Sequence, residues 1–485
     1  MIFRIASAAS LVLVWVMSSG LPAHAQFETR ASFFISGSSD PSFLVVGDFN
    51  CDGRPDVAVV NVVKNTSGNV EILLGNGDGT FRVGATYPFA APATTASAGS
   101  LRHNGILDLV LGAAGANVVY VLLGNGDGTF QLPVSYPTTA ESHTVALGDF
   151  TGKGNLDVLD LEGTGSQGVC NCIEVLPGNG DGTFGAPITT PVPYNIDGVA
   201  IVAGDFNDSG KLDVAVGGGV GSIEQVDILL GNGDGTFDPD GFYKLQAYPD
   251  AIASGYFTSD KTKLDLALPS DGISAMLGNG DGTFQQPVPY KVSLPSWVIA
   301  EDFNGDGKLD LAVSDSGSPL GGAPGVSVLN GNGDGTFQNA VFYPTGAEEG
   351  GQFVAAGDFN GDHRPDLLVL DSVHGYIWTL LNTGVVSFSP TTPLNFKKQA
   401  VGTTSPPQAV TLTNTGKNEL KIASVKASVG FGVTSTCGSG VASGAKCTIS
   451  ATFSPTKKGA AQGTVTIIDS ASTKPMVIEL LGTGT

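Results

Sequence analysis

Short apolar runs of roughly four to eight residues recur along the chain, separated by clusters of Gly, Asn and Asp. FLVVGDF from Phe43, DVAVV from Asp56 and NVEILLG from Asn69 show the pattern. Runs rich in Val, Ile, Leu and Phe between turn residues are typical of β-strands. Beyond residue 25, no segment carries a sustained apolar stripe with the period of an amphipathic helix. The pattern therefore predicts an all-β protein.

Two motifs repeat with a period of about 50 residues. GNGDGTF occurs six times, beginning at Gly75, Gly124, Gly178, Gly231, Gly278 and Gly331. An apolar run followed by a polar loop occurs seven times, with loops beginning at Asp48, Ser100, Asp149, Asp205, Tyr256, Asp302 and Asp358. Each unit carries four strand signals, which is the signature of a propeller blade. Seven units predict a seven-bladed β-propeller.

The two ends of the repeat region complement each other. The segment Phe27 to Ile35 precedes the first inner strand as an outermost strand would, but it has no blade of its own. The seventh unit ends in the degenerate string from Leu380 to Phe388, without a clear fourth strand. We expect the N-terminal segment to supply that strand, which would close the ring and remove an exposed edge.

Composition and the first residues point to an exported protein. The 485 residues include 23 Lys and Arg against 45 Asp and Glu, a net charge of −22 that argues against nucleic acid as a partner and suits cations. Arg4, the apolar run Ile5 to Met17 and the small residues Ala23 and Ala25 form a signal-peptide pattern. We expect cleavage after Ala25, no transmembrane segment, and a secreted or cell-surface location.

The polar loop of the first unit has the oxygen pattern of a cation site. Asp48, Asn50, Asp52 and Asp56 stand at positions 1, 3, 5 and 9, and Gly53 at position 6 allows a sharp turn. A hard cation with six to eight oxygen ligands needs this arrangement, which parallels the first part of an EF-hand loop. Ca²⁺ is the predicted occupant, since Mg²⁺ demands tighter geometry and keeps its waters.

Three further loops share this pattern. Their predicted ligands are Asp205, Asn207, Ser209 and Asp213; Asp302, Asn304, Asp306 and Asp310; and Asp358, Asn360, Asp362 and Asp366, where His363 replaces the glycine. The loops beginning at Ser100, Asp149 and Tyr256 are degenerate, and Arg102 and Lys153 stand at ligand positions. The alternative for every loop is a polar turn whose Asp and Asn side chains cap their own backbone.

The repeats DFNGDGKLDLAV at Asp302 to Val313, together with the GNGDGTF strings, resemble the FG-GAP or VCBS repeat family, whose members form seven-bladed propellers related to the integrin α-subunit head. The resemblance covers about Phe27 to Phe388. It implies Ca²⁺ in the loops and roles in adhesion, carbohydrate recognition or cell-surface contact. Since the family includes non-catalytic domains attached to enzymes, no single activity follows.

The repeats stop near residue 389, and Ser389 to Pro393 reads as a linker. Several short alternating strands follow, which predicts an immunoglobulin-like β-sandwich over 390–485 after a propeller over 26–389. The C-terminal part resembles the abnormal-spindle and hydin type domains called choice-of-anchor D in secreted bacterial proteins. It carries 9 Lys against 3 acidic residues, a net of +6, whereas residues 26–389 have a net charge of −29.

Five cysteines leave one without a partner. Cys437 and Cys447 flank a short Gly-rich loop, and we expect a disulfide between them in an oxidising compartment. Cys170 and Cys172 are too close in sequence for an unstrained bridge, so they and Cys51 are predicted to be free thiols.

The sequence carries little sign of catalysis. GxSxG and HExxH are absent, and GNGDGTF is interpreted as a hairpin turn rather than a phosphate loop because a strand follows it. We therefore predict a monomeric, non-catalytic binding or adhesion module for a glycan or an extracellular protein. The varied segments Pro191 to Asp197, Pro239 to Ala247 and Ser316 to Gly325 are candidate recognition loops. The alternative is an exported polysaccharide-degrading enzyme or its accessory subunit.

Overall fold

The computed structural model describes most of the chain after the predicted signal peptide, which lies outside the described residues. The described ranges are 27–35, 40–63, 66–114, 116–162, 172–192, 197–220, 223–304, 307–316, 323–345, 351–361, 364–382, 386–389, 394–414, 419–469 and 476–485. Every regular element in these ranges is a β-strand, which confirms the all-β prediction. They contain no helix that is long and apolar enough to cross a membrane.

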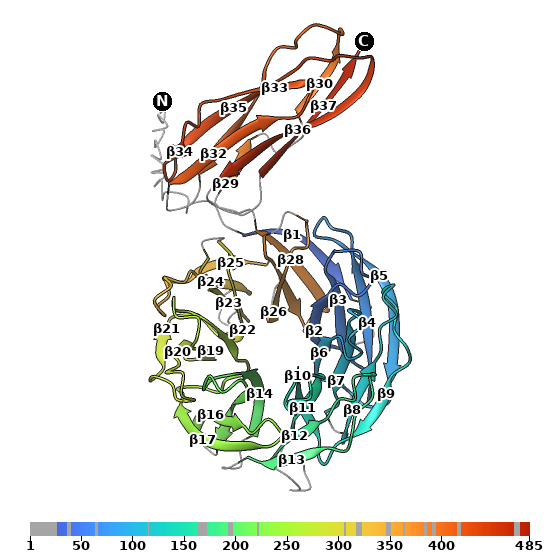
Figure 1. Ribbon diagram of the computed structural model, residues 1–485, viewed down its shortest axis with the longest axis vertical. Helices are drawn as coiled ribbons and strands as arrows, with labels where there is room; N and C mark the ends of the chain where they lie inside the picture. The colour runs from blue at the N-terminus through green and yellow to red at the C-terminus, as the bar shows by residue number, and fades with distance from the viewer. Residues whose placement is uncertain are drawn as a thin grey trace, which may run out of the picture.

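Seven four-stranded antiparallel sheets of the described chain surround a central axis as the blades of a propeller (Figure 1). Blades 1 to 3 are β2(Asp40–Gly47), β3(Asp56–Val63), β4(Ser67–Gly75) and β5(Phe81–Phe89); β6(Thr95–Gly99), β7(Asp108–Gly112), β8(Val118–Leu122) and β9(Val134–Pro137); and β10(Ser142–Gly148), β11(Asp157–Glu162), β12(Cys172–Leu176) and β13(Ile188–Pro191). Blades 4 and 5 are β14(Asp197–Gly204), β15(Asp213–Val220), β16(Ile223–Gly231) and β17(Phe237–Lys244); and β18(Ala253–Gly255), β19(Asp265–Ser270), β20(Gly272–Met276) and β21(Val288–Tyr290). Blade 6 is β22(Pro295–Glu301), β23(Asp310–Asp315), β24(Gly325–Leu329) and β25(Val341–Pro344), and blade 7 contains β26(Gly351–Gly357), β27(Asp366–Asp371) and β28(Tyr376–Asn382).

The N-terminal strand completes blade 7. β1(Phe27–Phe34) pairs antiparallel with β28, from Phe27 opposite Asn382 to Phe34 opposite Tyr376, and Figure 1 shows the blue β1 beside the brown β28. Phe27 packs edge-on against Phe303 of blade 6, with ring centroids 5.7 Å apart. The predicted closure of the ring is confirmed.

Aromatic contacts join neighbouring blades. In five of the six GNGDGTF strings, the final Phe packs against the Phe that follows the first loop residue of the preceding blade. The ring centroids are 5.2–6.0 Å apart in the pairs Phe81–Phe359, Phe130–Phe49, Phe237–Phe150, Phe284–Phe206 and Phe337–Phe257. Phe27 makes the same contact in blade 7, where no such string exists. Edge-on aromatic pairs add to the energy of apolar burial, so the repeated phenylalanines hold the blades together.

The C-terminal part is a β-sandwich, as predicted. One sheet contains β29(Val386–Ser389), β31(Gln408–Asn414), β35(Lys446–Phe453) and β33(Phe431–Ser435), and the other contains β30(Leu394–Gln399), β37(Met476–Gly484), β36(Gly459–Asp469), β32(Leu420–Ala427) and β34(Gly440–Val441). Inward residues of both sheets, among them Leu412, Phe453 and Val465, form one core. The sandwich begins earlier than the predicted boundary at residue 390, because β1 takes the fourth place in blade 7 and leaves Val386–Ser389 to pair with β31.

The cysteines divide differently from the prediction. Cys437 and Cys447 form the predicted disulfide, with their Cα atoms 4.9 Å apart. Cys172 is also disulfide-bonded, so its prediction as a free thiol was wrong, because spacing along the sequence alone does not decide whether a cysteine is bridged. Cys170 lies outside the described residues, and Cys51 is a free, exposed thiol.

Candidate functional site

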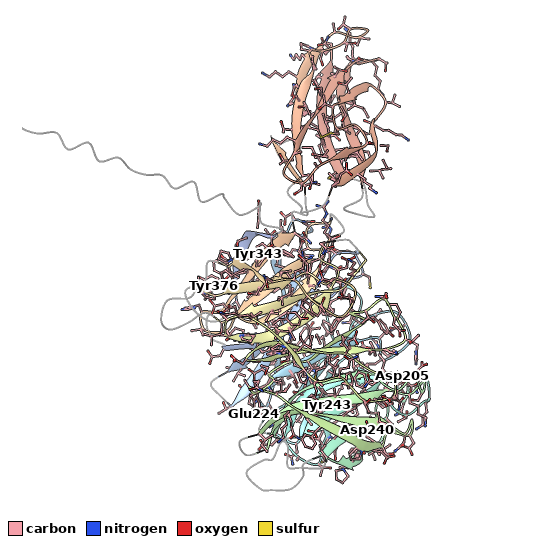
Figure 2. The ribbon with its side chains drawn as sticks, turned by 90° about the vertical axis from the view of Figure 1, so that its left-hand side faces the viewer. Asp205, Glu224, Asp240, Tyr243, Tyr343 and Tyr376 are labelled. Carbon is pink, nitrogen blue, oxygen red and sulfur yellow. A yellow bond between two sulfur atoms is a disulfide. The ribbon has the colours of Figure 1, made fainter. Side chains whose placement is uncertain are left out.

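The predicted cation loops all lie at one end of the blades. Each loop connects the innermost strand of a blade to the second strand, and we name the loops 1 to 7 after their blades. In the side view of Figure 2, Asp205 of loop 4 and Glu224, at the turn between β15 and β16, lie on opposite faces of the propeller. The loops therefore share one face, and the turns between second and third strands share the other.

Loops 1 and 4 bring the oxygens of positions 1 and 3 together. The amide N–H of Asp52 donates to Asp48 Oδ1 (3.1 Å) and to Asn50 Oδ1 (2.9 Å). The N–H of Ser209 makes the matching pair of bonds to Asp205 Oδ1 (2.9 Å) and Asn207 Oδ1 (3.1 Å). In each loop, two side-chain oxygens thus lie close together around the same backbone N–H group.

The side chain at position 5 does not join those of positions 1 and 3 but accepts a hydrogen bond further along the loop. Asp52 Oδ1 accepts a hydrogen bond from the N–H of Arg54 (2.9 Å), as Ser209 Oγ accepts one from Lys211 (3.3 Å). In loops 6 and 7 the corresponding Asp306 and Asp362, and His363, lie outside the described residues. Asp302 accepts from the N–H of Gly307 (2.8 Å), while Asn304, Asp358 and Asn360 are half-buried in their loops.

The aspartate that ends each loop is a buried backbone clamp. All seven are fully buried: Asp56, Asp108, Asp157, Asp213, Asp265, Asp310 and Asp366. Asp56 accepts hydrogen bonds from Phe49 N (3.0 Å) and Gly75 N (2.8 Å), and Asp108 accepts the same pair from Leu101 N (3.0 Å) and Gly124 N (2.8 Å). Because degenerate loops keep this clamp, its first role is to join the loop to the end of the third strand.

Two of the degenerate loops hold a basic side chain against their own oxygens. In loop 2 the Arg102 guanidinium contacts Asp108 Oδ1 (2.6 Å) and the carbonyl of Gly124 (2.6 Å). In loop 5 Lys261 Nζ donates to the carbonyl of Tyr256 (3.3 Å). Lys153 of loop 3 is exposed, and Asp149 there caps the N–H groups of Lys153 and Gly154. Side chains thus cap the backbone of their own loop both in loops with the cation pattern and in degenerate loops.

The loop carboxylates repel one another. Burial raises the pKa of Asp56, and the nearby charges of Asp52 and Asp48 raise it further. Burial and the charge of Asp205 likewise raise the pKa of Asp213. A cation among these oxygens would relieve the repulsion, and carboxylate and amide oxygens are the donors that Ca²⁺ prefers. Within the described ranges, however, no three His, Cys, Asp or Glu side chains are grouped closely enough to hold a metal by themselves.

The GNGDGTF strings form hairpin turns, which confirms their interpretation. In the first, Asn76 Nδ2 donates to Thr80 Oγ1 (2.9 Å), and Asp78 Oδ1 accepts from Thr80 N (3.0 Å). Gly77 and Gly79 have φ of 76° and 85°, which an L side chain rarely adopts. The N–H of Gly79 donates to the carbonyl of Phe359 in the adjacent blade (2.8 Å), so this turn also contacts a neighbouring loop.

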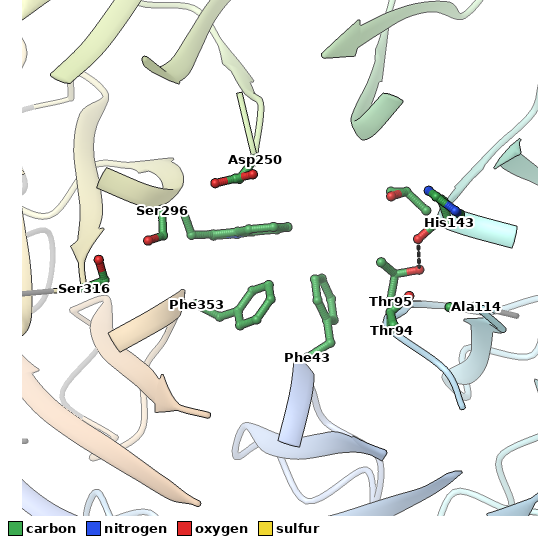
Figure 3. Close-up of a pocket in the computed structure, with 11 residues that line it drawn as sticks. Phe43, Thr94, Thr95, Ala114, His143, Asp250, Ser296, Ser316 and Phe353 are labelled. Carbon is green, nitrogen blue, oxygen red and sulfur yellow. Dashed lines mark hydrogen bonds between the residues drawn. The ribbon is translucent and has the colours of Figure 1, made fainter. Parts of the chain in front are cut away.

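A central pocket opens at the other end of the innermost strands (Figure 3). Its volume is about 540 Å³, and it is lined by Phe43, Thr94, Thr95, Ala114, His143, Thr144, Asp250, Ser296, Trp297, Ser316 and Phe353. The rings of Phe43, Trp297 and Phe353 touch, with centroids 4.8–5.4 Å apart. Six of the seven blades contribute to this lining, so the pocket lies on the axis of the ring.

This pocket was not predicted from the sequence, although the repeats contain a signal for it. The residue five places before the first loop position lines the pocket in five blades: Phe43, Thr95, Thr144, Trp297 and Phe353. In blades 4 and 5 this residue is Ala200 or Ala251. Of the predicted recognition segments, Ser316 lines the pocket, Pro239 to Lys244 belong to the outer strand β17, and residues 193–196 and 317–322 lie outside the described residues.

Comparison with known proteins agrees with this architecture. FG-GAP-like repeats match residues 48–111, 101–159, 262–313 and 302–369, and the domain described as abnormal spindle-like microcephaly-associated, ASPM-SPD-2-Hydin, matches residues 383–477. None of the curated proteins compared matches the sequence significantly.

The fold of a solved structure is similar at low sequence identity. BBS1N, in a complex with ARL6DN, has a TM-score of 0.51 at 13% identity, covering 74% of this chain and 97% of its own. The periplasmic gluconolactonase PpgL of Pseudomonas aeruginosa has a TM-score of 0.45 at 15% identity, covering 63% of this chain and 86% of its own. The family matches and the seven sheets together identify the chain as an FG-GAP-like repeat β-propeller followed by an ASPM-SPD-2-Hydin domain.

Proposed function

We propose that this protein is an exported, calcium-stabilised binding module that holds a glycan or protein ligand without transforming it. The central pocket carries the proposal, because a concave site with a few convergent polar and aromatic groups is the usual form of a small-ligand site. The FG-GAP-like repeats and the propeller fold are those of binding and adhesion modules. The BBS1N propeller was solved in complex with a protein partner, which supports a protein ligand as the second possibility.

The proposed calcium sites lie in loops 1, 4, 6 and 7. Their side-chain oxygens at positions 1 and 3 would hold the ion, while the buried aspartate at position 9 keeps the loop in place. Phe43 and Asp48 are five residues apart on an extended strand, or roughly 17 Å, so bound calcium would stiffen the strand ends without touching the ligand. Export is supported by the signal-peptide pattern and by the Cys437–Cys447 disulfide.

A glycan and polysaccharide array probed with the mature chain, with and without Ca²⁺, tests this function. We expect retention of a defined set of glycans, weaker after calcium removal, and no breakdown products. Released oligosaccharides would instead support an enzyme. A complete lack of retention, with capture of a defined cell-surface protein, would support the protein ligand.

A further inference from the structure

The lining of the central pocket is divided into three sectors. The aromatic sector is Phe43, Trp297 and Phe353, from the adjacent blades 1, 6 and 7. The hydroxyl sector is Thr94, Thr95 and Thr144, from blades 2 and 3. In blades 4 and 5 the equivalent positions are the small, buried Ala200 and Ala251, next to which Asp250 reaches the pocket. An axial channel without a ligand would need no such asymmetry.

Asp250 is the only carboxylate of the lining, and no hydrogen bond or ion pair satisfies it within the described part of the chain. Figure 3 shows its side chain on the same side of the pocket as Ser296, opposite His143. The carboxylate is accessible, yet surrounding atoms displace enough water to raise its pKa. A partly desolvated carboxylate without a partner is stabilised when a ligand places a cation beside it.

The same lining disfavours anions. None of its residues is Lys or Arg, and the predicted propeller segment, residues 26–389, has a net charge of −29. A negative field concentrates cations at such a pocket and repels carboxylates, sulfates and phosphates. Aromatic rings favour a cation as well, since their faces are electron-rich.

We propose that the central pocket binds a hexosamine unit whose amino group is free and protonated. This inference rests on the proposed binding function and names the sugar that the site would take. The C–H face of the sugar packs on the aromatic sector, its hydroxyl groups meet the Thr sector, and its ammonium group pairs with Asp250. A neutral hexose would leave the Asp250 carboxylate unpaired, whereas a simple alkylammonium ion would make no use of the three threonines.

Calorimetric titration of the mature chain with a glucosamine trisaccharide and its N-acetylated counterpart tests this assignment in mildly acidic buffer. Acetylation removes the charge but keeps the ring, so we expect the N-acetylated sugar to bind about tenfold more weakly. Asp250→Asn should abolish this preference, and Trp297→Leu should weaken both sugars. Asp271→Asn removes an exposed carboxylate in the turn between β19 and β20, outside the pocket lining, and should change neither.

Equal binding of the two sugars, or an unchanged preference in Asp250→Asn, would overturn the inference. If the array retains glycans equally on wild type and Asp250→Asn, the binding function stands and only the hexosamine assignment fails. If the trisaccharide titrates but the array retains nothing, the assignment holds and the proposed adhesion to polymeric glycans fails. Thermal melts of each variant establish that it is folded.

Discussion

Loops 1 and 2 occupy the same place in adjacent blades and share the same buried clamp aspartate. They differ in whether a basic side chain of the loop contacts that aspartate. Loop 1 gathers Asp48, Asn50 and Asp52 beside the clamp residue Asp56 without a basic group against it. Loop 2 has Ser100, Arg102 and Asn104 instead, and the Arg102 guanidinium lies on Asp108. The clamp therefore belongs to the fold, and the remaining loop positions differ in whether the chain itself supplies a positive charge.

The clamp itself should give the largest effect, and a similar one in both loops. Asp56→Ala and Asp108→Ala each leave two buried N–H groups without an acceptor, which costs about 4 kcal/mol of unfolding free energy. Urea denaturation followed by fluorescence measures this, because Trp297 and Trp378, the tryptophans beyond residue 25, both belong to the propeller. A loss confined to one of the two variants would show that the loops are not built alike.

Loss of the Arg102–Asp108 ion pair of loop 2 should give the second-largest effect on stability. Arg102→Met leaves the buried Asp108 without its ionic partner and should lower the unfolding free energy by about 3 kcal/mol. The loss should be the same with and without Ca²⁺, since loop 2 lacks the ligand set. Arg102→Lys, as the matched control, should recover part of the stability. Rescue of Arg102→Met by Ca²⁺ would contradict the distinction between the loops.

Loss of calcium from a single site should have a smaller effect, and only loops 1, 4, 6 and 7 should contribute to it. At a Ca²⁺ concentration tenfold above its dissociation constant, each occupied site adds about 1.4 kcal/mol, and chelation should lower the melting temperature accordingly. Asp48→Ala should reduce this response. Asp149→Ala removes the same two backbone caps from a degenerate loop and should leave the calcium response unchanged. A melting curve indifferent to chelation would count against the calcium sites.

The pH dependence should be the smallest effect. The folded-state pKa values of Asp56 and Asp213 are raised, so the calcium-free folded protein holds their protons more tightly than the unfolded chain does. This stability is present at low pH and is lost as the pH rises through the folded pKa values. Without calcium, wild type should therefore gain stability relative to Asp56→Asn as the pH falls from about 7 to about 4. A difference that does not change with pH would contradict this.

The repeats in the sequence were enough to predict the blades and their closure. The hydrogen-bond partners of the loop aspartates and the central pocket could not be predicted. Seven loop motifs and six turn strings were enough to predict the blades, and the unpartnered segment at Phe27 predicted how the ring closes. Asp56 was interpreted as a ligand because spacing cannot show that its oxygens face Phe49 and Gly75. The central pocket was missed because Phe43, Trp297 and Phe353 lie far apart in sequence and meet only when the ring forms.

The strand that closes the ring also orders events during synthesis. β1 precedes every other strand of the propeller in the chain, yet its partner β28 is made last in the propeller, with Phe27 paired to Asn382. Until then β1 has no partner strand, and the ring of nascent blades stays open. Contacts between such distant positions slow folding and prolong exposure of strand edges. A chain interrupted before residue 376 therefore has no closed state to reach, which makes synthesis of β28 the step that commits the propeller to its native form.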